Sequence, residues 1–359
     1  MQKRKIKTRR SIINRLLCAL MATVIIPVLI SSTVYAGEID AMSGKKPTFR
    51  YKDTVLCPGG MTFGVKIFTE GVLIVGLSSF KGDGKEYCPA SEAGLKPRDI
   101  ILSANGNEVN KVEEVSKFIA HSGGKTVTFK IKRDGTEKDI EITPQRSDEG
   151  GYKAGMWLRD STAGIGTVTF VDPEGKSFGG LGHGICDVDT GVLMPLRKGT
   201  ALGASIGGVN KGKSGRPGEL KGYFKPEKFG SIEQNTDCGV FGVYAEMPEN
   251  VSKPIPVGSR DELREGKAEI LCTLGDDGIG KYEIKISKID RDSTDNKSFM
   301  ITVTDPELKA RTGGIVQGMS GSPVIQDGKL VGAVTHVMVS DPETGYGVFI
   351  ENMLDVMSE

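Results

Sequence analysis

Apolar and polar positions alternate along much of this chain, and the period of the alternation changes between segments. The segment MTFGVKIFTEGVLIVGL, which begins at Met61, contains two strand-like runs broken at Glu70-Gly71. A short helix, an apolar strand and an Asn-Gly turn follow. In KVEEVSKFIAHSGG, which begins at Lys111, apolar residues recur at helical spacing before a glycine pair, and two alternating strands then flank an Asp-Gly turn. This order predicts a small α+β domain over residues 54–147.

The second half of the chain consists of short alternating runs such as GIGTVTFVD, CGVFGVYAEM and KYEIKISKI. Turn residues separate these runs, and segments with helical periodicity are scarce. About 210 residues of this kind are typical of an all-β barrel or a pair of barrels. The glycine-rich stretch QRSDEGGYKAG lies at the joint, so residues 148–359 are predicted to form a second domain. The predicted fold class is therefore mainly β.

The N-terminal segment has a different composition, with seven basic residues and no acidic residue in its first 36 positions, and it includes the apolar run LLCALMATVIIPVLI. Val34 and Ala36 supply small or aliphatic side chains at cleavage-like positions, so residues 1–36 are predicted to be a secretory signal. The alternative is an uncleaved membrane anchor, because the apolar run approaches the length that spans a bilayer. Under either interpretation residues 37–359 are exported, with 37–53 as a polar linker, and the N-terminus contacts the membrane before any cleavage.

The charge balance and the cysteine and histidine spacing argue against two classes of function, nucleic-acid binding and metal binding. The chain has 47 basic and 46 acidic side chains, and without the seven basic residues of the N-terminal segment the balance is 40 against 46. This excess of acid gives no electrostatic reason to expect nucleic-acid binding. No C-x-x-C spacing and no H-E-x-x-H motif occurs, so no metal or other cofactor is expected. Five cysteines follow the signal, and their pairing stays open: Cys57, Cys88, Cys186, Cys238 and Cys272.

The motif GMSGSPV contains the best candidate for a nucleophile. A serine hydroxyl is a weak nucleophile that needs a base, a group that orients the base, and donors for the developing oxyanion. Small residues around Ser320 let the backbone turn sharply, so that the N–H groups of Gly318 and Ser320 point at one oxyanion. Ser322 is the rival nucleophile, but its place before Pro323 fits the exit of the turn.

The chain has three histidines as candidate bases. His121 ends the predicted helix, where a histidine favours the helix dipole, and its role is expected to be structural. His183 lies between glycines in GLGHG after a strand pair, which leaves its ring approachable, and it precedes Ser320 as in the chymotrypsin order. His336 lies in the strand after Ser320 and is a candidate for binding a polar P1 side chain of the substrate. The alternative interpretation is that His336 is a hydrogen-bonded histidine of the core.

The first predicted domain resembles a PDZ domain of the kind attached to bacterial extracytoplasmic proteases. Its most specific part is SEAGLKPRDIILSANGNEV, in which Arg98 replaces the usual glycine. The resemblance implies that peptide tails add to a sheet edge beside the helix. The residues implied to lie nearest the peptide are Met61, Thr62, Phe63 and Gly64 in PGGMTFGV, with Val115 and Phe118 on the helix side. Val115 fits core packing of an amphipathic helix equally well.

The second predicted domain resembles chymotrypsin-like proteases, because GMSGSPV is similar to their G-D-S-G-G-P. Met319 replaces the acid that pairs with a newly cut N-terminus in trypsin-like enzymes, so activation of that type is not expected. Together with the PDZ-like domain, GLGH, TDPELKARTGGIVQGMSGSPVIQDGKLVGAVTHV and GYGVFIENML resemble the stage IV sporulation protein B family of serine peptidases. That resemblance implies a double β-barrel with His183 as base, Ser320 as nucleophile and Asp305 as acid.

Other carboxylates remain candidates for orienting the base. Asp187 and Asp189 follow His183 closely, although they also fit the closing of the DVDTG turn. Asp237 precedes a strand, as the acid of the chymotrypsin order does. A dyad without an acid is the remaining alternative.

The family resemblance also implies a biological setting. The chain is expected to be an exported serine endopeptidase of spore formation, at the forespore inner membrane and the intermembrane space. It is expected to cut itself and a membrane-bound regulator, which releases an intramembrane metalloprotease that activates a late sigma factor. The PDZ-like domain is expected to select peptide tails and to restrain the peptidase. The competing interpretation is an exported PDZ scaffold whose barrel binds partners without catalysis.

Overall fold

The structure is a computed structural model that describes residues 49–248 and 251–358. The expected signal, residues 1–36, and most of the expected linker lie outside the described residues. Within the two described ranges, no helix is both long and apolar enough to cross a membrane. The described chain is mostly β and consists of a PDZ-like domain and two β-barrels.

Six strands close the first barrel. β11 pairs with β12, the pairing continues through β15, β14, β13 and β2, and β2 pairs back with β11. Inside it, the rings of Phe63 and Phe178 meet edge to face at 6.0 Å. The strand bounds are β2 Thr62–Leu77, β11 Met156–Val171, β12 Ser177–Gly180, β13 Leu196–Asn210, β14 Glu219–Thr236 and β15 Gly239–Tyr244, with β1 Val55–Pro58 and β16 Ile255–Pro256 added at one edge.

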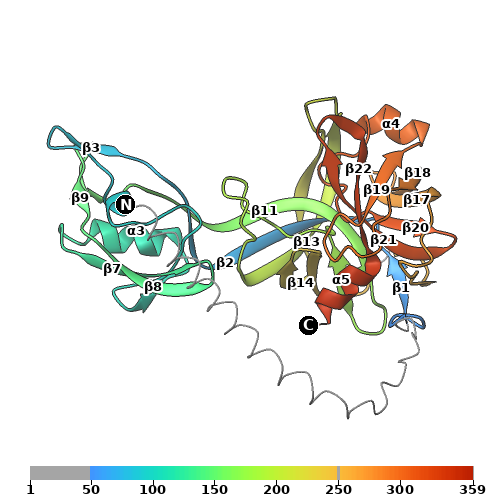
Figure 1. Ribbon diagram of the computed structural model, residues 1–359, viewed down its shortest axis with the longest axis horizontal. Coiled ribbons are helices and arrows are strands. Elements are labelled where there is room, and N and C mark those ends of the chain that lie inside the picture. Colours follow the sequence, from blue (N-terminus) through green and yellow to red (C-terminus); the bar gives the residue numbers. More distant parts are fainter. Residues whose placement is uncertain (1–48, 249–250, 359) are drawn as a thin grey trace, which may run out of the picture. The chain divides into compact units, whose positions relative to one another are not determined.

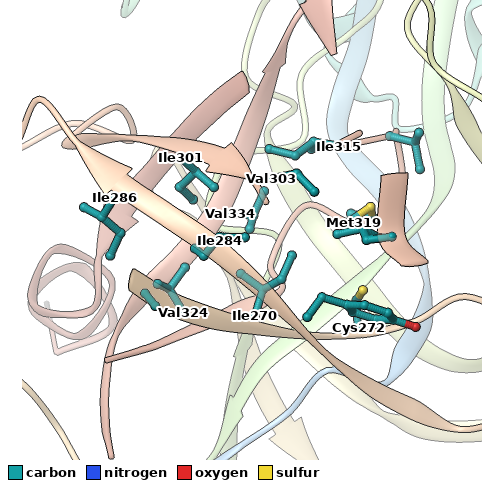
Figure 2. Packing of buried hydrophobic residues seen from close by; sticks show 14 of the residues in the cluster. Ile270, Cys272, Ile284, Ile286, Ile301, Val303, Ile315, Met319, Val324 and Val334 are labelled. Carbon is teal, nitrogen blue, oxygen red and sulfur yellow. The ribbon is translucent and has the colours of Figure 1, made fainter. Parts of the chain in front are cut away.

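The second barrel is closed by the six strands β17, β18, β19, β22, β21 and β20, in that order. In β18 the side chains of Tyr282, Ile284 and Ile286 are buried and those between them are exposed, which is the period of a strand with one face in a core. Figure 2 shows the isoleucines and valines that fill this barrel. The bounds are β17 Gly266–Thr273, β18 Ile279–Ser287, β19 Phe299–Val303, β20 Pro323–Gln326, β21 Lys329–Met338 and β22 Asp341–Phe349, with helices α4 Pro306–Thr312 and α5 Ile350–Met357.

The PDZ-like domain packs α3 against a small sheet. The buried face of α3 carries Val115 and Ile119, which join a core with Ile101 and Phe129 of the sheet. The elements are β3 Phe80–Gly82, β4 Lys85–Tyr87, α2 Pro89–Glu92, β5 Ile100–Ala104, β6 Asn107–Glu108, α3 Val112–Ala120, β7 Val127–Arg133, β8 Thr136–Ile142, β9 Gln145–Arg146 and β10 Tyr152–Lys153.

Two long strands, β2 and β11, belong to both regions, and they lie side by side (Figure 1). The first run of β2 pairs with β13 of the barrel, whereas the run after Gly71 pairs with β5 of the PDZ-like domain. Residues 55–70 therefore join the first barrel, although the sequence predicted a PDZ-like domain that begins at residue 54. The two runs of β2 alternate equally well, and alternation alone does not say which sheet a strand joins.

Candidate active site

The serine motif forms a tight turn that leads into β20. The Gln317 carbonyl accepts a hydrogen bond from a β14 N–H at 2.9 Å, and the Met319 carbonyl accepts one from the N–H three residues later at 2.9 Å. A carbonyl and the N–H of the next residue point in opposite directions in a trans peptide. These bonds therefore turn the N–H groups of Gly318 and Ser320 to the other side. Among the described residues, neither N–H has an acceptor, as donors to an oxyanion require.

The turn is docked on β11 of the first barrel. The Thr167 hydroxyl donates to the Gly318 carbonyl at 2.9 Å, and the Thr167 N–H donates to the Ser320 carbonyl at 2.9 Å. Two residues along the strand, the Thr169 hydroxyl donates to the Gly321 carbonyl at 2.8 Å. Both threonines are buried. The sequence analysis did not single them out, because alternating threonines in a strand carry no motif of their own.

Met319 holds the turn from the opposite side. Its side chain is fully buried in the core of the second barrel, in the cluster that includes Ile315 and Val303 (Figure 2). The residue that replaces the acid of trypsin-like enzymes thus fixes the turn through apolar packing, with no need for an ion pair.

The Ser320 hydroxyl donates to the Thr335 carbonyl on β21 at 2.8 Å. It makes no hydrogen bond to His183 in this structure. Hydrogen bonds between catalytic groups often tighten only when substrate is bound, so the contact with Thr335 is compatible with the predicted role of Ser320.

His183 follows β12 after two residues with left-handed backbone conformations, Leu181 and Gly182. Its Nδ1 lies 2.8 Å from the carbonyl oxygen of Gly184. A carbonyl oxygen only accepts, so Nδ1 carries the proton and Nε2 has the free lone pair, which is the tautomer that a general base needs. Burial lowers the pKa of His183, and the hydrogen bond to Gly184 opposes that shift. The imidazole is therefore neutral at neutral pH.

His336 lies against His183, with the ring centroids 4.9 Å apart. Burial, together with the nearby His183 and Lys297, lowers the pKa of His336 to about 4. Its Nδ1 is buried and has no hydrogen-bond partner. The His336 imidazole is therefore neutral at neutral pH.

Ser320, His183 and His336 line one cavity of about 450 Å³. Thr335 and Gly318 also line this cavity, and most of its lining surface is apolar. The structure thus brings together the predicted nucleophile, base and P1 residue, which come from the two barrels.

The structure places Asp305 elsewhere, at the N-terminus of α4. One carboxylate oxygen accepts from the Leu308 N–H at 2.9 Å and the other from the Glu283 N–H at 3.3 Å. These bonds cap α4 and link it to β18. Among the described residues, no hydrogen bond joins Asp305 to His183.

Two of the other candidate carboxylates, Asp187 and Asp189, are bound by an arginine, and the third, Asp237, is exposed. Asp187 is buried and forms an ion pair with Arg159 of β11, and Asp189 binds the same guanidinium at 2.7 Å. Asp237 is exposed and lies near two cysteines, whose pKa values it helps to raise. In the part of the chain that the structure describes, the Gly184 carbonyl is the group that hydrogen-bonds the His183 ring.

The residues predicted to bind a peptide tail do not come together. Met61, Thr62, Phe63 and Gly64 lie at or in the first run of β2, at the first barrel, whereas Val115 is fully buried in the PDZ-like core with Phe118 packed at its edge. The reason is the change of sheet along β2, which carries PGGMTFGV away from α3.

A different segment of the chain faces α3. A cavity of about 1,070 Å³ lies between Ser116, Ile119 and Ala120 of the helix and residues 152–158. Gly155 has a left-handed conformation, with φ of 79°. In the described structure the N–H groups of Ala154 and Gly155 have no acceptor. Successive free N–H groups of this kind form an anion-binding nest.

All five described cysteines are free thiols, and no pair of them forms a disulfide. Cys57, Cys238 and Cys272 are buried, and Cys186 is exposed at the rim of the Ser320 cavity.

Comparisons with known proteins agree with the two regions. The sequence model of the SpoIVB peptidase S55 family matches residues 150–354, and that of the PDZ domain matches residues 84–143. A probable periplasmic serine endoprotease DegP-like of Bartonella henselae is 34% identical over 107 residues, 24% of this chain and 21% of that protein. A probable protease eep of Enterococcus faecalis is 36% identical over 58 residues, 16% of this chain and 14% of that protein. The matches thus span about a fifth or less of these relatives.

Two solved structures are similar in part. The Rv3671c protease of M. tuberculosis in its active form is 15% identical, with a TM-score of 0.32, over 55% of this chain and 74% of that chain. The PDZ domain of an SdrC-like protein from Listeria monocytogenes is 24% identical, with a TM-score of 0.21, over 25% of this chain and 87% of that chain.

Proposed function

This chain belongs to the SpoIVB peptidase S55 family of serine endopeptidases, and on that premise we propose that Ser320 is its nucleophile and His183 its general base. The observation that carries the proposal is the tautomer of His183. Its Nδ1–H is committed to Gly184, so the lone pair of Nε2 is free in a neutral ring that lines the same cavity as Ser320. The two unused N–H groups of Gly318 and Ser320 support it.

The proposed reaction follows from these groups. The Ser320 hydroxyl gives up its hydrogen bond to the Thr335 carbonyl and transfers its proton to His183 Nε2. At the same time Ser320 Oγ bonds to the carbonyl carbon of the substrate. The negative charge that develops on the carbonyl oxygen is stabilised by the N–H groups of Gly318 and Ser320, each worth about 10²–10³ in kcat in comparable sites. The imidazolium protonates the leaving amine. Water activated by His183 then hydrolyses the acyl-enzyme.

The biological setting is part of the proposal and rests on the family. We propose that the chain is exported through its N-terminal segment and acts at the forespore inner membrane. There it cuts itself and a membrane-bound regulator, which triggers intramembrane proteolytic activation of a late sigma factor. Family membership supports this role, and the PDZ domain supports substrates that are proteins or peptides.

Two binding roles are proposed for the surroundings of the site. His336 reads a polar P1 side chain, because its neutral imidazole lines the Ser320 cavity. The PDZ domain binds peptide tails between α3 and residues 152–158, with the terminal carboxylate on the N–H groups of Ala154 and Gly155.

The nucleophile is tested with the exported chain, residues 37–359, and a fluorophosphonate probe. We expect one label on Ser320 by intact mass and peptide mapping, no label in Ser320→Ala, and an unchanged label in Ser322→Ala. Cleavage of a peptide panel reports the P1 residue, and His336→Ala is expected to relax a preference for polar P1 side chains. A native chain that stays unlabelled and cuts no peptide, both alone and with a tail peptide bound to its PDZ domain, would overturn the proposal in favour of a PDZ scaffold.

The tail-binding site is tested by fluorescence anisotropy with peptides that end in a free carboxylate or in an amide. Loss of charge-assisted hydrogen bonds is expected to weaken the amide about tenfold or more. Ala120→Trp fills the cavity beside α3 and is expected to abolish binding, whereas Lys117→Trp, on the same helix outside the cavity lining, is expected to retain it. Equal affinity for the two peptides would contradict the carboxylate site.

A further inference from the structure

Asn235, near the end of β14, is bonded through its whole side-chain amide to the segment that follows His183. Its Oδ1 accepts from the Ile185 N–H at 2.8 Å, and its Nδ2 donates to the carbonyls of Ile185 at 3.0 Å and Met194 at 2.9 Å. The reverse orientation of the amide would set NH₂ against an N–H and oxygen against two carbonyls, so these partners fix the orientation. Asn235 thus clamps this segment at three points.

The bond to the Ile185 N–H also fixes the direction of the Gly184 carbonyl. The two groups belong to one planar trans peptide and point in opposite directions. Asn235 holds the N–H side, and the carbonyl side meets Nδ1 of His183 at 2.8 Å. A continuous line of hydrogen bonds therefore runs from Asn235 through a single peptide group to the imidazole.

Close packing prevents this peptide from turning. A Cβ atom at Gly184 would collide with Leu193 and would lie 2.7 Å from the carbonyl oxygen of Thr236, the residue after Asn235. The backbone at position 184 therefore rests directly against the strand that carries the clamp. Beyond it, the buried Asp187 ties the same segment to Arg159 of β11.

We propose that Asn235, acting through the Gly184–Ile185 peptide, is the positioning residue that keeps His183 in the tautomer and orientation of a general base. This inference rests on the proposed roles of His183 and Ser320 and deepens them. When Nε2 takes the proton of Ser320, the imidazolium keeps Nδ1–H on the Gly184 carbonyl, and the bond from Ile185 N–H to Asn235 polarises that carbonyl toward the charge. A side-chain amide and one peptide thus do the work of the orienting carboxylate in a Ser-His-Asp triad.

The test compares Asn235→Ala with Asp305→Asn in the exported chain. Asn235→Ala is expected to lower kcat about 10–100-fold with KM within threefold, the usual range for a group that orients a histidine from behind. Asp305→Asn keeps an acceptor for the α4 cap and is expected to leave kcat within about threefold. A kcat loss of 100-fold or more in Asp305→Asn, with Asn235→Ala near native, would overturn the inference and assign the role to Asp305.

Two further measurements test the positioning role of Asn235 when Asn235→Ala cuts no substrate or does not fold. In a chain labelled with ¹⁵N-histidine, NMR is expected to show His183 as the Nδ1–H tautomer, and Asn235→Ala is expected to mix in the Nε2–H form even if no substrate is cut. Should Asn235→Ala not fold, Asn235→Asp places a negative charge behind the same peptide. The acid limb of its kcat/KM profile is expected to move to higher pH. An unchanged tautomer or an unchanged limb would refute the positioning role.

Discussion

The two halves of the site, the turn that carries Ser320 and the segment that carries His183, are held in different ways. The serine turn is held on one side by hydrogen bonds from Thr167 and Thr169 of β11, and on the other by the buried side chain of its own Met319. The histidine segment is closely packed at the Gly184 backbone. Side chains from distant positions, Asn235 and Arg159, hold its backbone through hydrogen bonds and an ion pair.

This difference follows from what each half does. The proposed oxyanion donors are backbone N–H groups, so the turn must fix peptide planes, and the buried Met319 and the hydrogen bonds from β11 both do this. The proposed base, His183, is a side chain whose ring orientation matters, and orientation requires directed polar contacts. One half therefore has an apolar anchor, Met319, within its own motif, and the other depends on polar side chains from elsewhere in the chain.

The strongest test of this difference between the two halves is to remove a polar contact from the serine turn. Thr167→Val deletes the hydroxyl that holds the Gly318 carbonyl at almost constant volume. It leaves a buried carbonyl without a partner, at a cost of about 1–3 kcal/mol. This carbonyl belongs to the peptide that follows the Gly318 N–H, a proposed oxyanion donor, so kcat is expected to fall about tenfold or more, as measured by steady-state kinetics on a cleaved peptide.

Thr169→Val is the matched control on the same strand. It removes an equally buried hydroxyl bond, at 2.8 Å from the Gly321 carbonyl, on the far side of the nucleophile from the Gly318 donor. Thermal unfolding is expected to show a similar loss of stability, with a smaller loss of kcat. Equal kcat losses in the two variants would mean that the whole turn moves as a unit and that no single hydroxyl positions the oxyanion donors.

The same difference explains what the sequence could predict. The nucleophile turn is encoded in the contiguous motif GMSGSPV, and GLGHG likewise marks His183, so both residues could be proposed from the sequence. The polar supports of the His183 segment lie 52 residues after His183 at Asn235 and 24 residues before it at Arg159. They become neighbours only when the first barrel closes, and neither has a local pattern that indicates this contact.

The mainly β fold with two barrels could also be predicted, because turn spacing and alternation are local properties. The path of β2 could not. Its first run, which includes Phe63, alternates as a PDZ strand would, but it joins β13, and β11 supplies the strand that faces α3. Which of two similar runs pairs with which sheet depends on contacts between distant strands.

The smallest expected effect concerns His336, where the two halves touch. Its pKa is about 4 in the folded chain, below the ordinary value of about 6.5 that the unfolded chain has. The unfolded state therefore binds more protons between these values, so this histidine lowers stability as pH falls from about 6.5 to 4, by at most about 3 kcal/mol. Above pH 6.5 its protonation has no effect.

The variant His336→Gln tests this dependence. It is expected to flatten the decline of the urea-unfolding free energy between pH 7 and pH 4.5, and to leave a residual slope from His183, whose pKa is also lowered. If the slope of unfolding free energy against pH is unchanged in His336→Gln, protonation of the His336 ring costs no stability. The two halves of the site would then be coupled through the backbone alone.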